Sequence, residues 1–132
     1  YGYTELKRPD LVPTIMQDVF EKEKVEIWSD KPKRDFIFTE DAAEAVLKLL
    51  KTDFTGTLNL GSGKMSSLKY ISEIIEDLSG KKIISKNYDV SGPMEFNTNI
   101  EKICNLTGWK PKFDIKEGLE KTFKIMKSYY LK

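Results

Sequence analysis

The sequence predicts an α/β fold in which short strands are flanked by helices. Two observations support this prediction. Short apolar or alternating runs, such as Val25 to Trp28, alternate along the chain with segments whose apolar residues recur every three or four positions, such as 68–78. A chain of 132 residues, of which 39% are hydrophobic, is also large enough to bury one core. We therefore expect a single domain over residues 1–132.

Composition and charge exclude several classes of protein. The formal net charge is +1, so no attraction to nucleic acid or to a membrane surface is expected. No apolar run reaches the length of a membrane span, and no signal-peptide pattern occurs. The single cysteine, Cys104, excludes an internal disulfide and favours a reducing, cytoplasmic location. Because the chain has no histidine, Ser-His catalysis and histidine-ligated metal sites are excluded.

The first predicted helix follows Asp10, which is a plausible N-cap. Leu11, Val12 and Pro13 fall at its first turn, where a proline is tolerated because its missing N–H would be unpaired in any case. The apolar stripe of this helix consists of Ile15, Met16, Val19 and Phe20.

The second predicted element is a strand from Val25 to Trp28, because apolar and polar residues alternate there. Trp28 stands at the end of this strand, before a turn at 29–32. A tryptophan in this place either covers the edge of the core or stacks on a base or sugar ring. The sequence leaves both interpretations open and favours the first.

A strand, an acidic turn and a helix follow one another over residues 34–50. The triplet Phe-Ile-Phe at 36–38 predicts a short buried strand. Thr39 is expected to cap the helix, with Glu40 and Asp41 near its positive end. The apolar face of that helix is predicted to consist of Ala42, Ala45, Val46, Leu49 and Leu50.

Arg34 stands at the entrance of this strand. A guanidinium group is a fork of donors suited to a phosphate or a carboxylate. The alternative is a surface arginine that pairs with Asp35 or Glu40, and most surface charges are only solvated. Taken alone, the residues favour this alternative.

Residues 57–60 predict another strand, and a glycine turn at 61–63 follows it. The turn resembles two phosphate-binding motifs but departs from both. A dinucleotide fingerprint needs glycine or alanine where Ser66 stands, and a Walker motif needs serine or threonine where Met65 stands. A plain tight turn is therefore favoured, although its backbone N–H groups could bind an anion.

Helices dominate the rest of the chain. The helix over 68–78 is expected to begin at a cap of Ser66 or Ser67 and to end at Gly80. A short strand at 82–86 and an irregular loop at 87–98 follow. Asn99 and Asp114 are expected to cap the last two helices.

Several short sequences follow one another along the chain in a distinctive order. These are Tyr1-Gly2, Leu-Val-Pro (11–13), Ile-Trp (27–28), Arg-Asp-Phe-Ile-Phe-Thr-Glu-Asp-Ala-Ala (34–43), Leu-Asn-Leu-Gly-Ser-Gly (58–63), Leu-Thr-Gly-Trp-Lys-Pro (106–111) and Glu-Gly-Leu (117–119). Together they resemble the C-terminal half of the extended short-chain dehydrogenase/reductases, the NAD-dependent nucleotide-sugar epimerases and dehydratases. The resemblance covers nearly the whole chain.

The resemblance implies that this chain is the C-terminal fragment of a Rossmann-type enzyme. In that family the N-terminal half binds NAD and carries the Tyr-x-x-x-Lys pair, and the C-terminal half grips the nucleoside diphosphate of the sugar. Tyr1-Gly2 matches a point just downstream of the catalytic motif. We therefore expect no catalytic, cofactor-binding or metal-binding residue in this chain. NAD is expected to bind only to the absent N-terminal half. The parent enzyme would be an isomerase or a lyase, and the fragment alone is expected to be inactive.

The resemblance implies substrate-binding roles for Arg34, Trp28, Leu11 and Val12. Arg34 matches the arginine that holds the diphosphate, which reverses the preference drawn from the residues alone. Trp28 matches an apolar or aromatic position beside the base, and Leu11 and Val12 match a segment whose backbone meets the base. Asp41 matches an acidic position in the turn, where we expect it to cap the helix.

The chain also departs from the family pattern. The loop over 90–96 lacks the arginine that often forms a second clamp, and Lys86 is a candidate replacement. Asn99 stands where an aspartate usually begins the helix. The expected partner is a nucleoside-diphosphate sugar, and an exposed sheet edge would invite a homodimer. Two alternatives stay open: a stand-alone binding or interaction module, and a non-catalytic member in which Arg34 is only structural.

Overall fold

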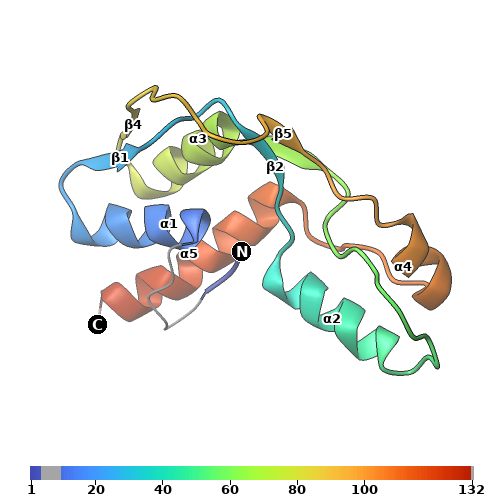
Figure 1. The fold of residues 1–132 in the computed structure, drawn as a ribbon. Coiled ribbons are helices and arrows are strands. Elements are labelled where there is room, and N and C mark those ends of the chain that lie inside the picture. Colours follow the sequence, from blue (N-terminus) through green and yellow to red (C-terminus); the bar gives the residue numbers. More distant parts are fainter. Residues whose placement is uncertain (4–9, 132) are drawn as a thin grey trace.

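The computed structural model describes residues 1–3 and 10–131 (Figure 1). Helices and short strands alternate along this part of the chain, which confirms the predicted α/β class. The elements in order are α1 (Leu11–Glu21), β1 (Val25–Ile27), β2 (Lys33–Asp35), α2 (Thr39–Leu49), β3 (Met65–Ser67), α3 (Leu68–Ser79), β4 (Ile83–Ser85), β5 (Glu95–Phe96), α4 (Glu101–Thr107) and α5 (Ile115–Tyr130).

The strands form two small sheets. β1 pairs with β4 in parallel, with Val25 opposite Ile83. In the other sheet β2 is central: it pairs with β3 antiparallel and with β5 in parallel. Helices α1, α3 and α5 pack together on one side, whereas α2 and α4 form a separate group (Figure 1). Loop 87–94 therefore runs from the end of the first sheet to the edge of the second.

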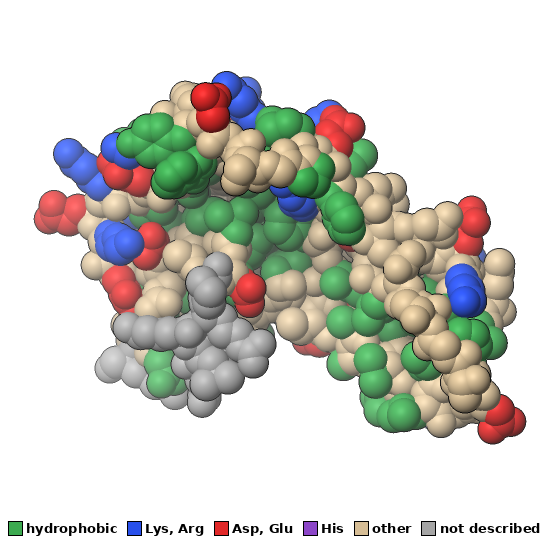
Figure 2. All heavy atoms as spheres, viewed as in Figure 1, with side chains coloured by type: hydrophobic (Ala, Val, Ile, Leu, Met, Phe, Trp, Pro, Cys, Tyr) green, Lys and Arg blue, Asp and Glu red, His purple; other side chains and the backbone are tan. Residues whose placement is uncertain are grey.

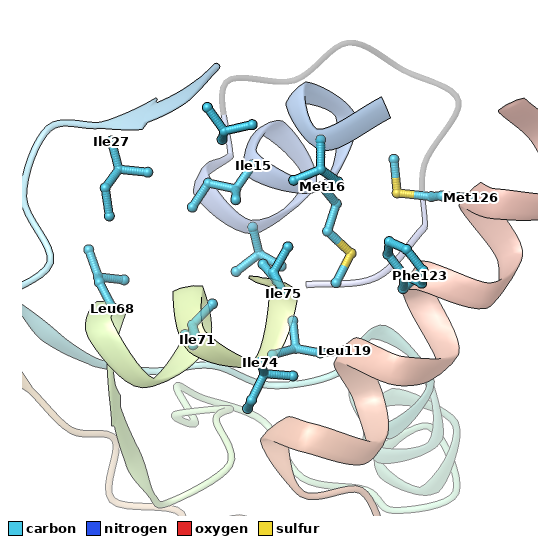
Figure 3. Packing of buried hydrophobic residues seen from close by; sticks show 13 residues of the cluster. Ile15, Met16, Ile27, Leu68, Ile71, Ile74, Ile75, Leu119, Phe123 and Met126 are labelled. Atoms are coloured by element: carbon cyan, nitrogen blue, oxygen red, sulfur yellow. The ribbon is translucent and has the colours of Figure 1, made fainter. Parts of the chain in front are cut away.

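The main core lies where α1, α3 and α5 meet β1 (Figure 3). The predicted stripe of α1 contributes Ile15, Met16 and Val19, each no more than 3% exposed. The other buried members are Val12, Val25, Ile27, Leu68, Ile71, Ile74, Ile75, Leu119, Phe123 and Met126. A second, much smaller core holds α2 to α4 and consists of Ala45, Ile103 and Trp109.

Two strand predictions are wrong. The strand expected at 36–38 lies at Lys33–Asp35, and residues 57–60 form no strand. The backbone at 36–38 has one neighbour to pair with, since the Tyr1 nitrogen donates to Ile37 O and the Thr39 nitrogen donates to Tyr1 O. Those two bonds do not make a ladder among the described residues. Strand formation depends on a partner segment, which an apolar triplet does not reveal.

Most of the predicted caps are confirmed. Asp10 is the N-cap residue of α1 by position, although its side chain makes no capping hydrogen bond. The Ser67 hydroxyl accepts from the Tyr70 nitrogen, and Gly80 ends α3 with a left-handed φ of 72°. Asp114 forms a full capping box with Glu117.

Two caps differ from the predictions. Thr39 is the first residue of α2, and the N-cap is Phe38, which has no side chain able to accept. Asn99 stands one residue before the N-cap, Ile100, although its side chain still accepts from the Glu101 nitrogen. Both misplacements are of one residue, the usual uncertainty at a helix end.

The apolar face predicted for α2 is only partly covered in this chain. Ala45 is fully buried, but Val46 is 48% and Leu50 is 76% exposed. The small core beneath α2 is too narrow to cover the whole face.

No helix in the described ranges is long and apolar enough to cross a membrane.

Glu76 ties the end of α3 to the start of β4. Its carboxylate accepts from the Ile83 nitrogen at 2.7 Å and pairs with Lys82 at 3.0 Å. The Ile83 N–H and, secondarily, Lys82 lower the pKa of Glu76, against a smaller opposing effect of burial. A carboxyl whose folded-state pKa is lowered stabilises the fold above its ordinary pKa, and the contribution disappears as the pH falls through the lowered value.

We expect Glu76→Gln to destabilise the chain at pH 7, and the difference from the wild type to shrink as the pH falls below the ordinary pKa of a glutamate and through the lowered pKa of Glu76. Urea unfolding followed by circular dichroism, at pH 7 and at successively lower pH, measures this difference. Glu73→Gln is the matched control, because Glu73 is exposed on the same helix and has no ion pair among the described residues. A difference that persists unchanged at low pH would show that the carboxylate charge is not its source.

Candidate functional site

Arg34 lies in the middle of β2, opposite Ser66 of β3 and Phe96 of β5. Its Nη1 donates to two backbone carbonyls, Lys33 O at 2.9 Å and Met94 O at 3.1 Å. The side chain is therefore fixed in direction through one nitrogen, while Nε and Nη2 make no bond within the described part of the chain. An arginine held in this way presents free donors in a defined orientation.

The alternative ion pairs of Arg34 are not formed. Asp35 faces the glycine turn: it accepts from the backbone nitrogens of Ser62 and Gly63 at 2.7 and 2.9 Å. The Ser62 hydroxyl adds a third bond at 2.6 Å. The turn is thus a tight turn whose N–H groups already bind an anion of the chain itself. No glycine-turn N–H is left for a phosphate at these two positions.

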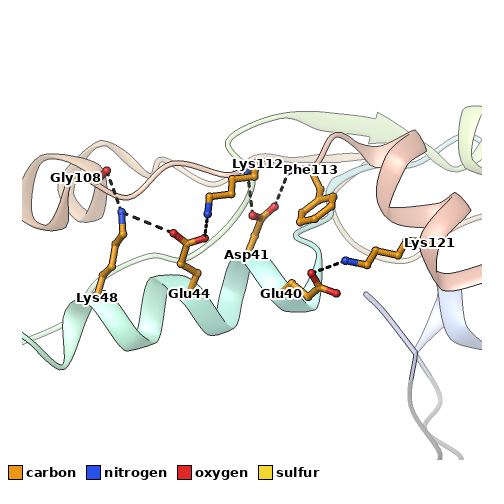
Figure 4. A network of polar contacts seen from close by, with 8 residues as sticks. All are labelled: Glu40, Asp41, Glu44, Lys48, Gly108, Lys112, Phe113 and Lys121. Atoms are coloured by element: carbon orange, nitrogen blue, oxygen red, sulfur yellow. Dashed lines mark hydrogen bonds and ion pairs between the residues drawn. The ribbon is translucent and has the colours of Figure 1, made fainter. Parts of the chain in front are cut away.

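The acidic pair at the start of α2 is structural (Figure 4). Glu40 pairs with Lys121 of α5 at 2.7 Å. Asp41 is only 1% exposed and accepts from the backbone nitrogens of Lys112 and Phe113 at 2.9 and 3.1 Å. The expectation that Asp41 caps α2 is therefore wrong, because its carboxylate bonds the segment that leads into α5.

Trp28 does not cover the core edge: its side chain is 64% exposed. Its Nε1–H donates to Asp89 O at 3.1 Å, and its ring meets Tyr88 edge to face with the centroids 4.8 Å apart. The preference for a core-covering Trp28 is therefore wrong, and the ring presents exposed surface at the end of β1.

Leu11 and Val12 differ in exposure. Val12 is 2% exposed and belongs to the main core, whereas Leu11 is 37% exposed at the start of α1. The Val12 side chain is therefore unavailable to a ligand, and only the backbone of this turn or the Leu11 side chain could meet a base.

Loop 87–94 connects the two ends of the candidate site. Tyr88 and Asp89 contact Trp28 at one end, and Met94 O holds Arg34 at the other. The sequence predicts an irregular loop here but not its contacts with Trp28 and Arg34, because these partners lie some sixty positions earlier in the chain. The one available sign was an aromatic residue within a polar stretch.

Lys86 does not serve as a free second clamp. Its Nζ pairs with Glu26 Oε1 at 2.7 Å, and this hydrogen bond raises the pKa of Lys86. Lys86 is therefore committed to Glu26, whereas Arg34 has no ion pair within the described residues.

A cleft of about 740 Å³ adjoins β3, and Met65 and Ser66, which pair with Asp35 and Arg34 of β2, are among the residues that line it. Phe36, Ile100 and Cys104 line its apolar part, and Lys64 and Lys110 stand among its polar residues. None of the four predicted substrate-binding residues lines it. Among the described residues, no group of three or more acidic or cysteine side chains is placed to hold a metal ion.

The spacing Tyr-x-x-x-Lys occurs once in this chain, at Tyr3 and Lys7. Lys7 lies outside the described residues. The Tyr3 ring packs against Tyr129, with the centroids 6.1 Å apart. Because Tyr3 follows Tyr1-Gly2, which resembles a point downstream of the catalytic motif, the spacing alone assigns no chemistry to this pair.

Comparison with known proteins finds a matching family model and related sequences. The model of the NAD dependent epimerase/dehydratase family matches residues 1–61. The sequence is 31% identical over 105 residues to GDP-mannose 3,5-epimerase of Arabidopsis thaliana, covering 76% of this chain and 27% of that protein. It is 31% identical over 125 residues to UDP-glucuronate 4-epimerase of Thermodesulfobacterium geofontis, covering 91% of this chain and 39% of that protein.

Solved structures agree in fold. UDP-glucose 4-epimerase of Thermotoga maritima, determined with UDP-glucose, superposes with a TM-score of 0.83 at 20% identity and covers 98% of this chain and 43% of that one. An epimerase of Methanothermobacter thermautotrophicus gives a TM-score of 0.87 at 20% identity, over 99% of this chain and 42% of that one. At this identity the likeness shows the fold alone.

The chain belongs to the NAD dependent epimerase/dehydratase family. It spans less than half the length of the curated relatives that it matches.

Proposed function

We propose that this chain is the sugar-nucleotide-binding portion of an NAD-dependent epimerase or dehydratase, and that Arg34 binds the diphosphate. On this proposal the chain supplies binding energy and orients the substrate, which lowers the entropic part of the barrier. Proton and hydride transfer, and the binding of NAD, belong to residues outside these 132. The chain alone is then expected to catalyse neither epimerisation nor dehydration.

The observation that carries the proposal is the uncompensated charge of Arg34. Its two acidic neighbours in sequence are taken, Asp35 by the glycine turn and Glu40 by Lys121. Arg34 has no ion pair in the described ranges, yet two carbonyls fix its guanidinium. A half-buried cation with oriented free donors is suited to an anionic ligand, and a diphosphate fits the planar fork of an arginine.

Relatives support the class of ligand. The names of the matched proteins include epimerases of GDP-mannose and of UDP-glucuronate. A structural neighbour was determined with UDP-glucose, and another with UDP-glucuronic acid and NAD. We therefore propose a nucleoside-diphosphate sugar as the substrate class of this chain.

Titration calorimetry with uridine diphosphate (UDP) tests the role of Arg34. We expect Arg34→Ala to weaken binding roughly 10- to 100-fold, the range for losing a hydrogen bond to a charged group. Arg34→Lys should recover part of the affinity, because it restores the charge without the fork. Lys124→Ala is the matched control, since Lys124 is exposed on α5, has no ion pair among the described residues and carries the same charge.

The alternatives give different results. An Arg34→Ala chain that binds UDP as tightly as the wild type would make Arg34 structural and overturn the diphosphate assignment. Equal losses in Arg34→Ala and Lys124→Ala would show that only net charge matters.

A further inference from the structure

A small polar cavity of about 160 Å³ lies between α3 and the β1–β4 pair. It is large enough to hold more than a single water molecule. Among the described residues that line it, three are acidic, Asp30, Glu73 and Glu76, and one is a cation, Lys69. The cavity therefore has an excess of negative charge.

The cavity lies on one face of the β1–β4 pair. Ile27 and Ser85 are opposite each other in the register of the two strands, and both line the cavity. Glu26 and Lys86, one position away from each of them, form an ion pair with each other. Because successive side chains of a strand point to opposite faces, that ion pair lies on the other face. The cavity is therefore separate from the Glu26–Lys86 side of the pair.

The Ser72 hydroxyl is buried beside this cavity without a hydrogen-bond partner among the described residues. Ser72 is only 7% exposed. Three other helical hydroxyls, those of Ser79, Thr107 and Thr122, donate to the carbonyl four residues earlier at 2.7 Å. The Ser72 hydroxyl makes no such bond. A buried hydroxyl without a partner costs free energy, and a ligand in the cavity would supply that partner.

Two of the three carboxylates are available as acceptors. Glu76 is committed to Lys82 at 3.0 Å, whereas Asp30 and Glu73 have no ion pair within the described ranges. The Ser85 hydroxyl donates to Asp30 Oδ1 at 3.3 Å, and Asp30 Oδ2 has no bond in the described part of the chain. The cavity thus combines an unpartnered hydroxyl with two unpaired acids.

We propose that this cavity binds a primary ammonium group carried on a short apolar chain, with Ser72 and Asp30 as acceptors. A primary ammonium has three N–H donors and no acceptor, which suits a hydroxyl and a carboxylate that lack a donor. A metal ion does not fit, because no described group of three or more acidic or cysteine side chains is placed to hold one. Ile27 and Ile83 give the apolar chain a wall to contact. This inference is independent of the function proposed above.

The overall charge of the surface does not explain such binding. In Figure 2 acidic and basic side chains intermingle on the left part of the molecule, where β1 and β4 lie. The formal net charge of the chain is +1. Affinity for an ammonium group must therefore come from the acceptors of the cavity, and the charge of Lys69 should oppose it.

Titration with n-propylammonium chloride at constant ionic strength, followed by nitrogen–proton correlation spectra, tests the proposal. We expect saturable shifts of the backbone amide signals of Ser72 and Ser85. Ser72→Ala should weaken binding roughly 10-fold, the effect of losing a hydrogen bond to a charged group. This variant should fold as the wild type does, because the hydroxyl makes no bond within the described residues. Asp30→Asn should also weaken binding, and Lys69→Gln should strengthen it.

A matched variant and a matched ligand serve as controls. Asp77→Asn removes the same charge as Asp30→Asn, but Asp77 is exposed on α3 and does not line the cavity. Tetramethylammonium carries the same charge as n-propylammonium and has no N–H donor. We expect Asp77→Asn to bind n-propylammonium as the wild type does, and tetramethylammonium to leave the amide signals of Ser72 and Ser85 in place.

The contrary results are distinct. A wild type that shows no saturable shift with n-propylammonium would overturn the site. Equal shifts with tetramethylammonium, or equal losses in Asp77→Asn and Asp30→Asn, would show that only charge matters and would overturn the hydrogen-bonded ammonium. Undiminished binding by Ser72→Ala would remove Ser72 from the site and overturn the proposal as stated. Weaker binding by Lys69→Gln would contradict the charge argument.

Discussion

Asp41→Ala is expected to lower the free energy of unfolding by about 2–4 kcal/mol, because it leaves two backbone N–H groups without their acceptor. The Asp41 carboxylate is 1% exposed and bonds the nitrogens of Lys112 and Phe113, seventy positions away (Figure 4). These bonds connect the start of α2 to the segment that enters α5. Urea unfolding followed by circular dichroism measures the loss.

Glu44 provides the matched control for Asp41. It lies one turn further along α2 and also reaches Lys112, but through a surface ion pair at 2.7 Å. Exposed pairs of this kind contribute little because solvent screens them, so Glu44→Ala should cost far less than Asp41→Ala. Asp41→Asn should fall between them, since it keeps one acceptor oxygen. Equal losses in Glu44→Ala and Asp41→Ala would contradict the role given to the buried bonds.

The helices could be predicted because their signals are local. The capping box of Asp114 and Glu117, the Ser67 cap and the glycine at 80 all act within four residues of the helix end that they define. The strands could not be placed in the same way. Residues 36–38 have the composition of a strand, but the ladder forms at 33–35, where residues 65–67 and 95–96 supply partners.

The candidate site was predictable only in part, because it too depends on contacts between segments that are far apart in the sequence. Arg34 was identified from its position, but its free charge depends on where Asp35 and Glu40 find partners, 27 and 81 positions away. The exposure of Trp28 and the burial of Val12 also depend on tertiary packing. Tyr88 had no local signal beyond its ring, and the backbone turn at Asn87 brings it to Trp28.

Trp109→Ala is expected to have the largest effect on stability, about 3–5 kcal/mol, the usual range for truncating a buried aromatic side chain. Trp109 is fully buried and is the largest member of the small core that joins α2 to α4. Its indole Nε1 has no hydrogen-bond partner in the described part of the structure. Trp109→Phe should therefore cost much less than Trp109→Ala, since it keeps most of the apolar volume and gives up no bond.

Hydrogen exchange can show where the stability is lost. The main core shares no buried member with the small core, so Trp109→Ala should accelerate exchange in α2 and α4 while α3 keeps its protection. Ile71→Ala, in the main core, should instead lower protection in α1, α3 and α5. A uniform loss of protection in Trp109→Ala would show that the two cores unfold as one unit. Selective loss would mean that β1, whose Val25 and Ile27 belong to the main core, keeps its support when the α2–α4 group opens.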